Sequence, residues 1–152
     1  MIQLTFAQLK QNPSFGSALM KLRRCTTFSP KPSYWIGRIL KKIEGEWKAA
    51  DDMQYKIWLK YCQKDETTGR FVEEKGQLKL RDDVSKEEFE KEMSEFWAIS
   101  FTIPFNKLKL EDLEAVKEPG LTPDEIMAIE PLILHLEEIK GVQSGDQEKS
   151  TS

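Results

Sequence analysis

The sequence predicts an α+β fold, specifically a helix-rich single domain with one long amphipathic helix and a small antiparallel sheet. Three observations predict it. Apolar residues recur at spacings of three and four through residues 36–61, which is the period of a helix. A Lys75-Gly76 pair lies between two short strand-like runs, as in a hairpin. Apolar and polar residues alternate over residues 99–105, which indicates a further strand.

One domain is expected over residues 1–140. A chain of 152 residues has the usual size of a single domain, and 39% hydrophobic with 32% charged residues is an ordinary globular composition. Residues 141–152 contain one sizeable apolar side chain, Val142. Because such a segment cannot offset its ordering entropy by burial, it is predicted to be a flexible C-terminal tail.

The longest helix is expected to begin after Pro30 and Pro32, with Ser33 capping its first turn. It should reach about Cys62, which makes it roughly 45 Å long at about 1.5 Å per residue. The apolar stripe that predicts it consists of Ile36, Leu40, Ile43, Trp47, Ala50, Gln54, Ile57 and Tyr61.

Two features modify this helix. The stripe is widened by Ile39, Met53 and Trp58, so the helix is expected to pack against more than one neighbour. Gly37 and Gly45 each weaken it by about 1 kcal/mol, which makes residues 44–47 a place where it could break.

A turn over residues 64–69 is expected to end the long helix, and the hairpin follows. The candidates for the inner face of the hairpin are Phe71, Leu78 and Leu80.

A helix over residues 85–97 begins with a capping box from Ser85 to Glu88. Its apolar side is formed by Phe89, Met93, Phe96 and Trp97. The strand over residues 99–105 contains Pro104, which places it at a sheet edge or near its own end.

Residues 106–121 fit a strand and a helix equally well, and both alternatives stay open. A second capping box, Thr122 to Glu125, then opens the last helix, with Pro123 at its first position. Pro131 should kink or divide that helix. The residues expected on its packing side are Ile126, Ile129, Ile133 and Leu136.

Charge is distributed unevenly along the chain. The net charge is −3, yet residues 1–48 carry nine basic and two acidic side chains, a net charge of +7, and the remainder carries −10. Such asymmetry suggests an acidic partner for the first part, a complementary contact between copies of the chain, or neutralisation of the two parts within one fold.

The basic residues off the apolar stripe form the candidate binding surface, a basic face made of Arg23, Arg24, Lys31, Arg38, Lys41, Lys42 and Lys48. A protein is the favoured partner, either another copy or another protein. Nucleic acid is the alternative, and the acidic sequence pI of about 5.4 argues against it. The four tryptophans could stack on bases, but at helical spacing they are interpreted as core.

We expect no catalytic residues, no cofactor and no metal. The single histidine, His135, lies between Leu134 and Leu136, and acidic pairs such as Asp51-Asp52 are typical of solvated helix faces. No Gly-rich phosphate loop, dinucleotide fingerprint or zinc spacing is present. The two cysteines are Cys25 and Cys62, which are too far apart in the sequence for a metal knuckle. Both are interpreted as buried small hydrophobic residues. Neither a signal peptide nor a membrane span is supported, so we expect a cytosolic protein.

Five segments in order carry a resemblance: "SALMKLRR", "WLKYCQKDETTG", "GQLKL", "SKEEFEKEMSEFW" and "LTPDEIMAIEPLI". Over about Phe15 to Ile133 the chain resembles a family of small uncharacterised proteins encoded by tailed bacteriophages. The resemblance implies a viral setting: a virion connector, a tail or baseplate part, an assembly factor, or an inhibitor of host defences. It implies a location in the host cytoplasm or in the virion. It assigns no functional residues.

Overall fold

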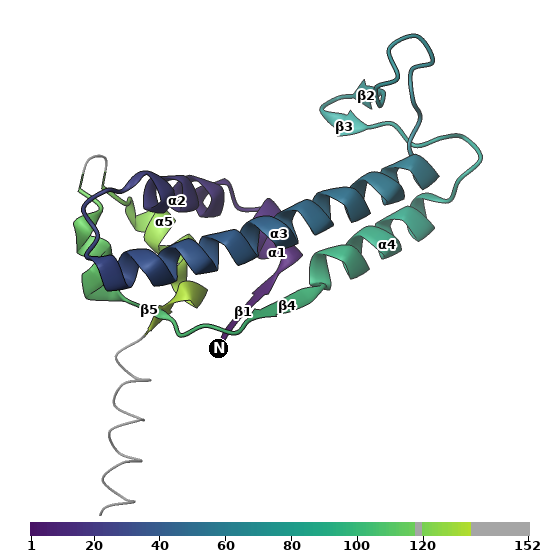
Figure 1. Cartoon of the computed structure of the whole chain (residues 1–152). Helices are drawn as coiled ribbons and strands as arrows, with labels where there is room; N and C mark the ends of the chain where they lie inside the picture. The colour runs from purple at the N-terminus through teal and green to yellow at the C-terminus, as the bar shows by residue number, and fades with distance from the viewer. Residues whose placement is uncertain (118–119, 135–152) are drawn as a thin grey trace, which may run out of the picture.

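One long helix organises the molecule. The computed structural model describes residues 1–117 and 120–134, and within them α3 (Pro30–Tyr61) is 32 residues long. Figure 1 shows α2, α5 and β5 around the N-terminal part of α3, whereas the hairpin and α4 (Lys86–Ala98) accompany its C-terminal part. We call residues 55–95 the arm. The predicted helix-rich α+β fold with one long helix is confirmed.

The start of α3 differs from the prediction. The helix begins at Pro30 with Ser29 as N-cap, and the Ser33 N–H donates to the Ser29 carbonyl oxygen (3.0 Å). The prediction that Ser33 caps the helix is therefore wrong. Pro30 and Pro32 fit inside the first turn because backbone N–H groups there have no intrahelical acceptor to lose.

The helix is continuous through Gly37 and Gly45, so the break that the sequence allowed does not occur. Apart from the neighbouring residues and the backbone of α3 itself, a Cβ atom at either position would meet no atom within 4 Å. Neither glycine is therefore required by a close contact. Burial of the apolar stripe on both sides of them holds the helix despite its low local propensity.

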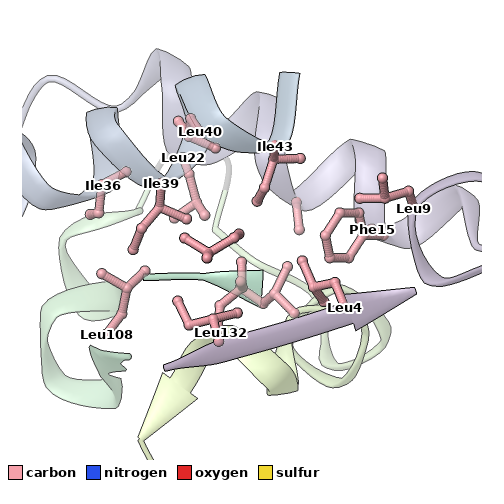
Figure 2. Close-up of a cluster of buried hydrophobic side chains, with 14 of the residues drawn as sticks. Leu4, Leu9, Phe15, Leu22, Ile36, Ile39, Leu40, Ile43, Leu108 and Leu132 are labelled. Carbon is pink, nitrogen blue, oxygen red and sulfur yellow. The ribbon is translucent and has the colours of Figure 1, made fainter. Parts of the chain in front are cut away.

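The buried side of α3 confirms the predicted stripe. Six of its eight members are buried, and Trp47 and Ile57 are half-buried. Of the flanking residues, Ile39 is buried, whereas Met53 is 40% exposed. Figure 2 shows the α3 members of the core facing side chains of α2 and β1. The core labelled there comprises Leu4, Leu9, Phe15, Leu22, Ile36, Ile39, Leu40, Ile43, Leu108 and Leu132.

The sequence analysis assigns no element to the first 24 residues, which form β1 (Ile2–Thr5), α1 (Phe6–Lys10) and α2 (Pro13–Arg24). A capping box between Thr5 and Gln8 opens α1. The sheet formed by β1 and β4 (Ser100–Ile103) is antiparallel. These elements close the core beneath the N-terminal part of α3.

Among the described residues, three two-stranded sheets take the place of the single antiparallel sheet that was expected. The β1–β4 sheet and the hairpin of β2 (Glu73–Glu74) with β3 (Gln77–Leu78) are antiparallel, as predicted. The third, β5 (Leu108–Lys109) with β6 (Ile133–Leu134), is parallel. The hairpin turn has φ values of 52° at Lys75 and 77° at Gly76, as its sequence predicts.

Residues 106–117 resolve the ambiguity left by the sequence, because they form β5 followed by a 3-10 helix, η1 (Leu110–Ala115). The next helix is α5 (Pro123–Ala128), with the predicted capping box in place. Pro131 lies in a separate 3-10 turn, η2 (Glu130–Leu132), so it divides the helix as expected.

The packing side of this last region is partly as predicted. Ile129 and Ile133 are buried, but the prediction is wrong for Ile126, which lies within α5 and is 37% exposed, whereas the buried residue of that helix is Glu125. Leu136, His135 and the expected tail at residues 141–152 lie outside the described residues.

The arm is built by α4 packing antiparallel to the end of α3. The Phe89 ring lies 5.5 Å from that of Tyr61, and the Phe96 ring lies 5.2 Å from that of Phe6 in α1. The hairpin adds Phe71, half-buried between the rings of Tyr55 and Trp58. The other two predicted inner-face residues of the hairpin are also half-buried, Leu78 and Leu80.

Candidate functional site

Three aromatic side chains surround an arginine on the outer face of α3. The Arg38 guanidinium carbon lies 5.6 Å from the Tyr34 ring centroid and 5.1 Å from that of Phe105. Its Nη1 donates to the Tyr34 hydroxyl (2.8 Å). Trp35 completes the group, with its ring 5.2 Å from Tyr34 and 5.9 Å from Phe105. We call these four residues the Arg38 patch.

The helix period explains why Tyr34 and Arg38 face outward together. They are four residues apart, so they lie one above the other on one side of α3. That side is opposite the buried stripe. Phe105 arrives from a different element, because β4 ends at Ile103 and Pro104 leads the chain back towards α3. The patch therefore depends on the tertiary fold.

The patch is accessible. Tyr34 is 55% exposed and Trp35 is 40% exposed, although both are large rings that folding usually covers more fully. Arg38 and Phe105 also line an open groove of about 600 Å³, together with Lys41, Lys42, Gly45 and Glu46. A cationic groove beside exposed aromatic rings can hold a carboxylate-rich or phosphate-rich partner through charge and stacking.

The structure brings together some of the predicted basic face. Arg38, Lys41 and Lys42 line the one groove, with Lys42 Nζ 3.6 Å from Glu46 Oε1. Lys31 and Lys48 are exposed on the same helix. Within residues 1–117 and 120–134, no ion pair involves Lys31, Lys41 or Lys48.

The remaining two members of the predicted face lie on α2. Arg23 forms an ion pair with Glu44 of α3, so part of its charge is compensated. Arg24 lines a different groove, of about 810 Å³, between the C-terminal part of α2 and the end of η1 with the residues that follow it. Its other lining residues include Lys21, Cys25, Thr27 and Lys117.

Cys25 lines this second groove and is half-buried against the hydrophobic core, so its interpretation as a buried hydrophobe is only partly correct. The Thr27 hydroxyl donates to the Ala115 carbonyl oxygen (2.6 Å), and the Cys25 sulfur lies 3.3 Å from that hydroxyl. Cys62, in contrast, is buried as predicted, and burial raises the pKa of its thiol.

The buried carboxylate of Glu125 beside this groove has a structural role. It accepts hydrogen bonds from Ser17 Oγ (2.8 Å), Lys21 Nζ (2.6 Å) and the Thr122 N–H (2.9 Å), which ties α2 to α5. Burial opposes its ionisation, but the bonds from Lys21, Thr122 and Ser17 outweigh that cost and lower its pKa to about 2. With its oxygens engaged in this way, Glu125 is not placed to act as a base.

A second polar group lies in the arm. The Glu92 carboxylate accepts from Lys60 Nζ (2.5 Å) and from the Tyr61 hydroxyl (2.8 Å). The bond from Lys60, and then that from Tyr61, lowers the pKa of Glu92, and the bond to Glu92 raises the pKa of Lys60. The pKa of Tyr61 is raised, first by burial and then by Glu92. The group joins α3 to α4.

The surroundings of this group are acidic. Between Asp82 and Glu95 the chain has seven acidic and two basic side chains, a net charge of −5. We call five of its exposed carboxylates the acidic surface, and they are Asp82, Asp83, Glu87, Glu88 and Glu95. Half of the net charge of −10 that the sequence places after residue 48 therefore lies on α4 and the turn before it.

The described residues offer neither a metal site nor a helix that could cross a membrane. Residues 1–117 and 120–134 contain no group of three or more His, Cys, Asp or Glu side chains arranged to hold a metal ion. Their helices include none with the length and apolar character of a membrane crossing. Asp51 forms an ion pair with Lys10, and Asp52 is exposed.

Comparison of the chain with family models, with curated proteins and with solved structures gives no match.

Three members of the Arg38 patch were not predicted from the sequence as site residues: Tyr34, Trp35 and Phe105. The prediction that the tryptophans are core residues is wrong for Trp35, whereas Trp47, Trp58 and Trp97 are half-buried. Trp35 is not a member of the apolar stripe of α3, and its position outside the stripe could have predicted that its side chain is exposed. No sequence pattern places Phe105 beside Arg38, which is 67 positions earlier in the chain.

Proposed function

We propose that the protein is a non-enzymatic bacteriophage protein that acts in assembly through protein–protein contacts, and that the Arg38 patch is its contact surface. The observation that carries the proposal is the exposure of Tyr34 and Trp35 around Arg38. Tryptophan, tyrosine and arginine are the residue types that dominate binding energy at protein interfaces. The bacteriophage setting rests on the sequence resemblance alone.

The geometry of the patch favours binding because its central side chain is already ordered. Arg38 lies near two rings and donates to Tyr34, so little of its rotamer freedom remains to be lost when a partner binds. A guanidinium held over aromatic rings keeps further N–H donors for partner carboxylates. The surrounding lysines supply long-range attraction to an acidic partner.

The test is the incorporation of variants into assembled particles or into the partner complex isolated from infected cells. Trp35→Ala and Arg38→Ala should each reduce incorporation at least tenfold, because truncating a central interface residue typically costs about 2 kcal/mol or more. The matched control is Lys56→Ala, an exposed lysine on the same helix outside the patch. Equal incorporation of all three variants would contradict the assignment of the patch.

Nucleic acid is a second candidate partner, because aromatic rings beside lysines are also the residue set that holds single strands. It predicts binding of single-stranded DNA or RNA with a steep loss of affinity as salt rises. The net charge of −3 and the acidic surface oppose this reading. A gel-shift series from 50 to 200 mM salt (about 10³-fold loss for six phosphate contacts) would establish it, and absence of any shift would remove it.

A further inference from the structure

We infer that the Arg38 patch binds the acidic surface of a second copy of this chain, so that two copies associate side by side in opposite directions. The inference rests on the proposed function, since it names the partner of the same patch. Its basis is the placement of complementary charge at two separate positions along α3.

The two surfaces lie far apart within one molecule. Arg38 and Lys60 are 22 positions apart on the continuous helix α3, which corresponds to about 33 Å at about 1.5 Å per residue. Glu92 contacts Lys60, so the acidic surface lies around the end of α3 remote from the patch. The Debye length is about 8 Å at physiological salt, so the two surfaces do not neutralise each other within one copy.

One stretch of chain connects the acidic surface to Phe105 of the patch and runs back along α3. The chain runs back antiparallel to α3 from Phe89, which contacts Tyr61, to Phe105, which contacts Arg38 and Trp35. The acidic surface is at the start of this return path and Phe105 is at its end. Figure 1 shows α4 and β4 following one another along that path.

This arrangement fits a two-fold pair. If a second copy lies antiparallel to the first, its acidic surface reaches the first copy's patch, and its own patch reaches the first copy's acidic surface. Both contacts are then made at once, and the association closes at two copies, as in most symmetric oligomers. Of the acidic surface, Glu87, Glu88 and Glu95 form no ion pair with another described residue, so their charge is available to a partner.

Sedimentation of charge-reversed variants tests the inference. One variant reverses the patch (Arg38→Glu with Lys42→Glu) and another reverses the acidic surface (Glu88→Lys with Glu95→Lys). The wild-type protein should sediment as a species of twice 17.7 kDa at low salt and shift towards monomer as salt rises. Each variant alone should be monomeric, because it presents like charges at both contacts.

An equimolar mixture of the two variants should restore the pair, because each reversed surface then meets its complement. Lys56→Glu with Arg70→Glu, two exposed cations outside the patch, is the control and should pair like wild type. Thermal melting of each variant verifies that it is folded. Failure of the mixture to pair, with both variants folded, would overturn the inference.

A wild-type protein that stays monomeric up to about millimolar concentration would also overturn the inference, since a dissociation constant above that concentration corresponds to a binding free energy weaker than about 4 kcal/mol. The proposed function would survive that result if Trp35→Ala still lost incorporation into particles. Assemblies larger than two copies that depend on the same charges would overturn the two-fold geometry.

Discussion

Truncation of Ile43 should strongly destabilise the fold. Ile43 is 1% exposed and lies in the middle of the buried side of α3, in the cluster that contains Phe15 and Leu22 (Figure 2). Ile43→Ala removes three carbon atoms, worth about 0.8 kcal/mol each by transfer. The cavity left behind adds to this loss, since a close-packed core relaxes only partly, and the total should be about 3 to 4 kcal/mol.

The assay is denaturant unfolding followed by tryptophan fluorescence, with a thermal melt as a second measure. For a chain of this size the melting temperature should fall by roughly 10 °C, at about 2–4 °C per kcal/mol. Met53→Ala is the matched control, because Met53 lies on the same helix and is 40% exposed, so it should cost under about 1 kcal/mol. A loss at Ile43 within about 0.5 kcal/mol would refute the assignment of this side of α3 to the core.

Three further predictions concern a buried acid, the absence of catalysis and the hairpin turn. Because the pKa of Glu125 is lowered to about 2, its contribution to the free energy of unfolding is complete above pH about 4.5 and is lost as the pH falls towards 2. The free energy of unfolding of Glu125→Gln should lack this acid-dependent component. A pH profile of stability equal to that of the wild-type protein would contradict the Glu125 network. His135→Ala and Asp52→Ala, in protein that folds, should leave particle incorporation within about tenfold of wild type, whereas a larger loss at unchanged stability would indicate a specific role for that residue. Gly76→Ala should destabilise the hairpin by roughly 1 kcal/mol, because Gly76 has a φ of 77° and alanine is strained there. Hydrogen exchange of the hairpin amides measures this loss. Equal protection of those amides in both proteins would contradict the prediction.

Local sequence patterns predicted the parts of the fold that depend on local spacing. The α3 stripe, the Lys75-Gly76 turn and the Thr122 capping box each follow from neighbouring residues, and each is present. The N-cap of α3 was misplaced because Pro30 and Pro32 are compatible both with an extended lead-in and with a first helical turn.

The sheet and the site depended on contacts between distant residues. Nothing near Leu108 indicates that it pairs in parallel with Ile133, so the third sheet was not predictable. The basic part of the site was found because charge is visible in composition. Its aromatic part was not, because Phe105 and Arg38 are 67 positions apart in the sequence and are brought together only by the tertiary fold.

Site-specific photocrosslinking from position 34 in infected cells tests the central claim most directly. Tyr34 is 55% exposed in the Arg38 patch, so a photoreactive residue there should form adducts with protein, identified by mass spectrometry. Those adducts should be lost when Arg38→Glu is added and should be absent when the photoreactive residue replaces Lys56. Adducts with nucleic acid alone, or equal adducts from both positions, would contradict the account of the Arg38 patch as a protein contact surface.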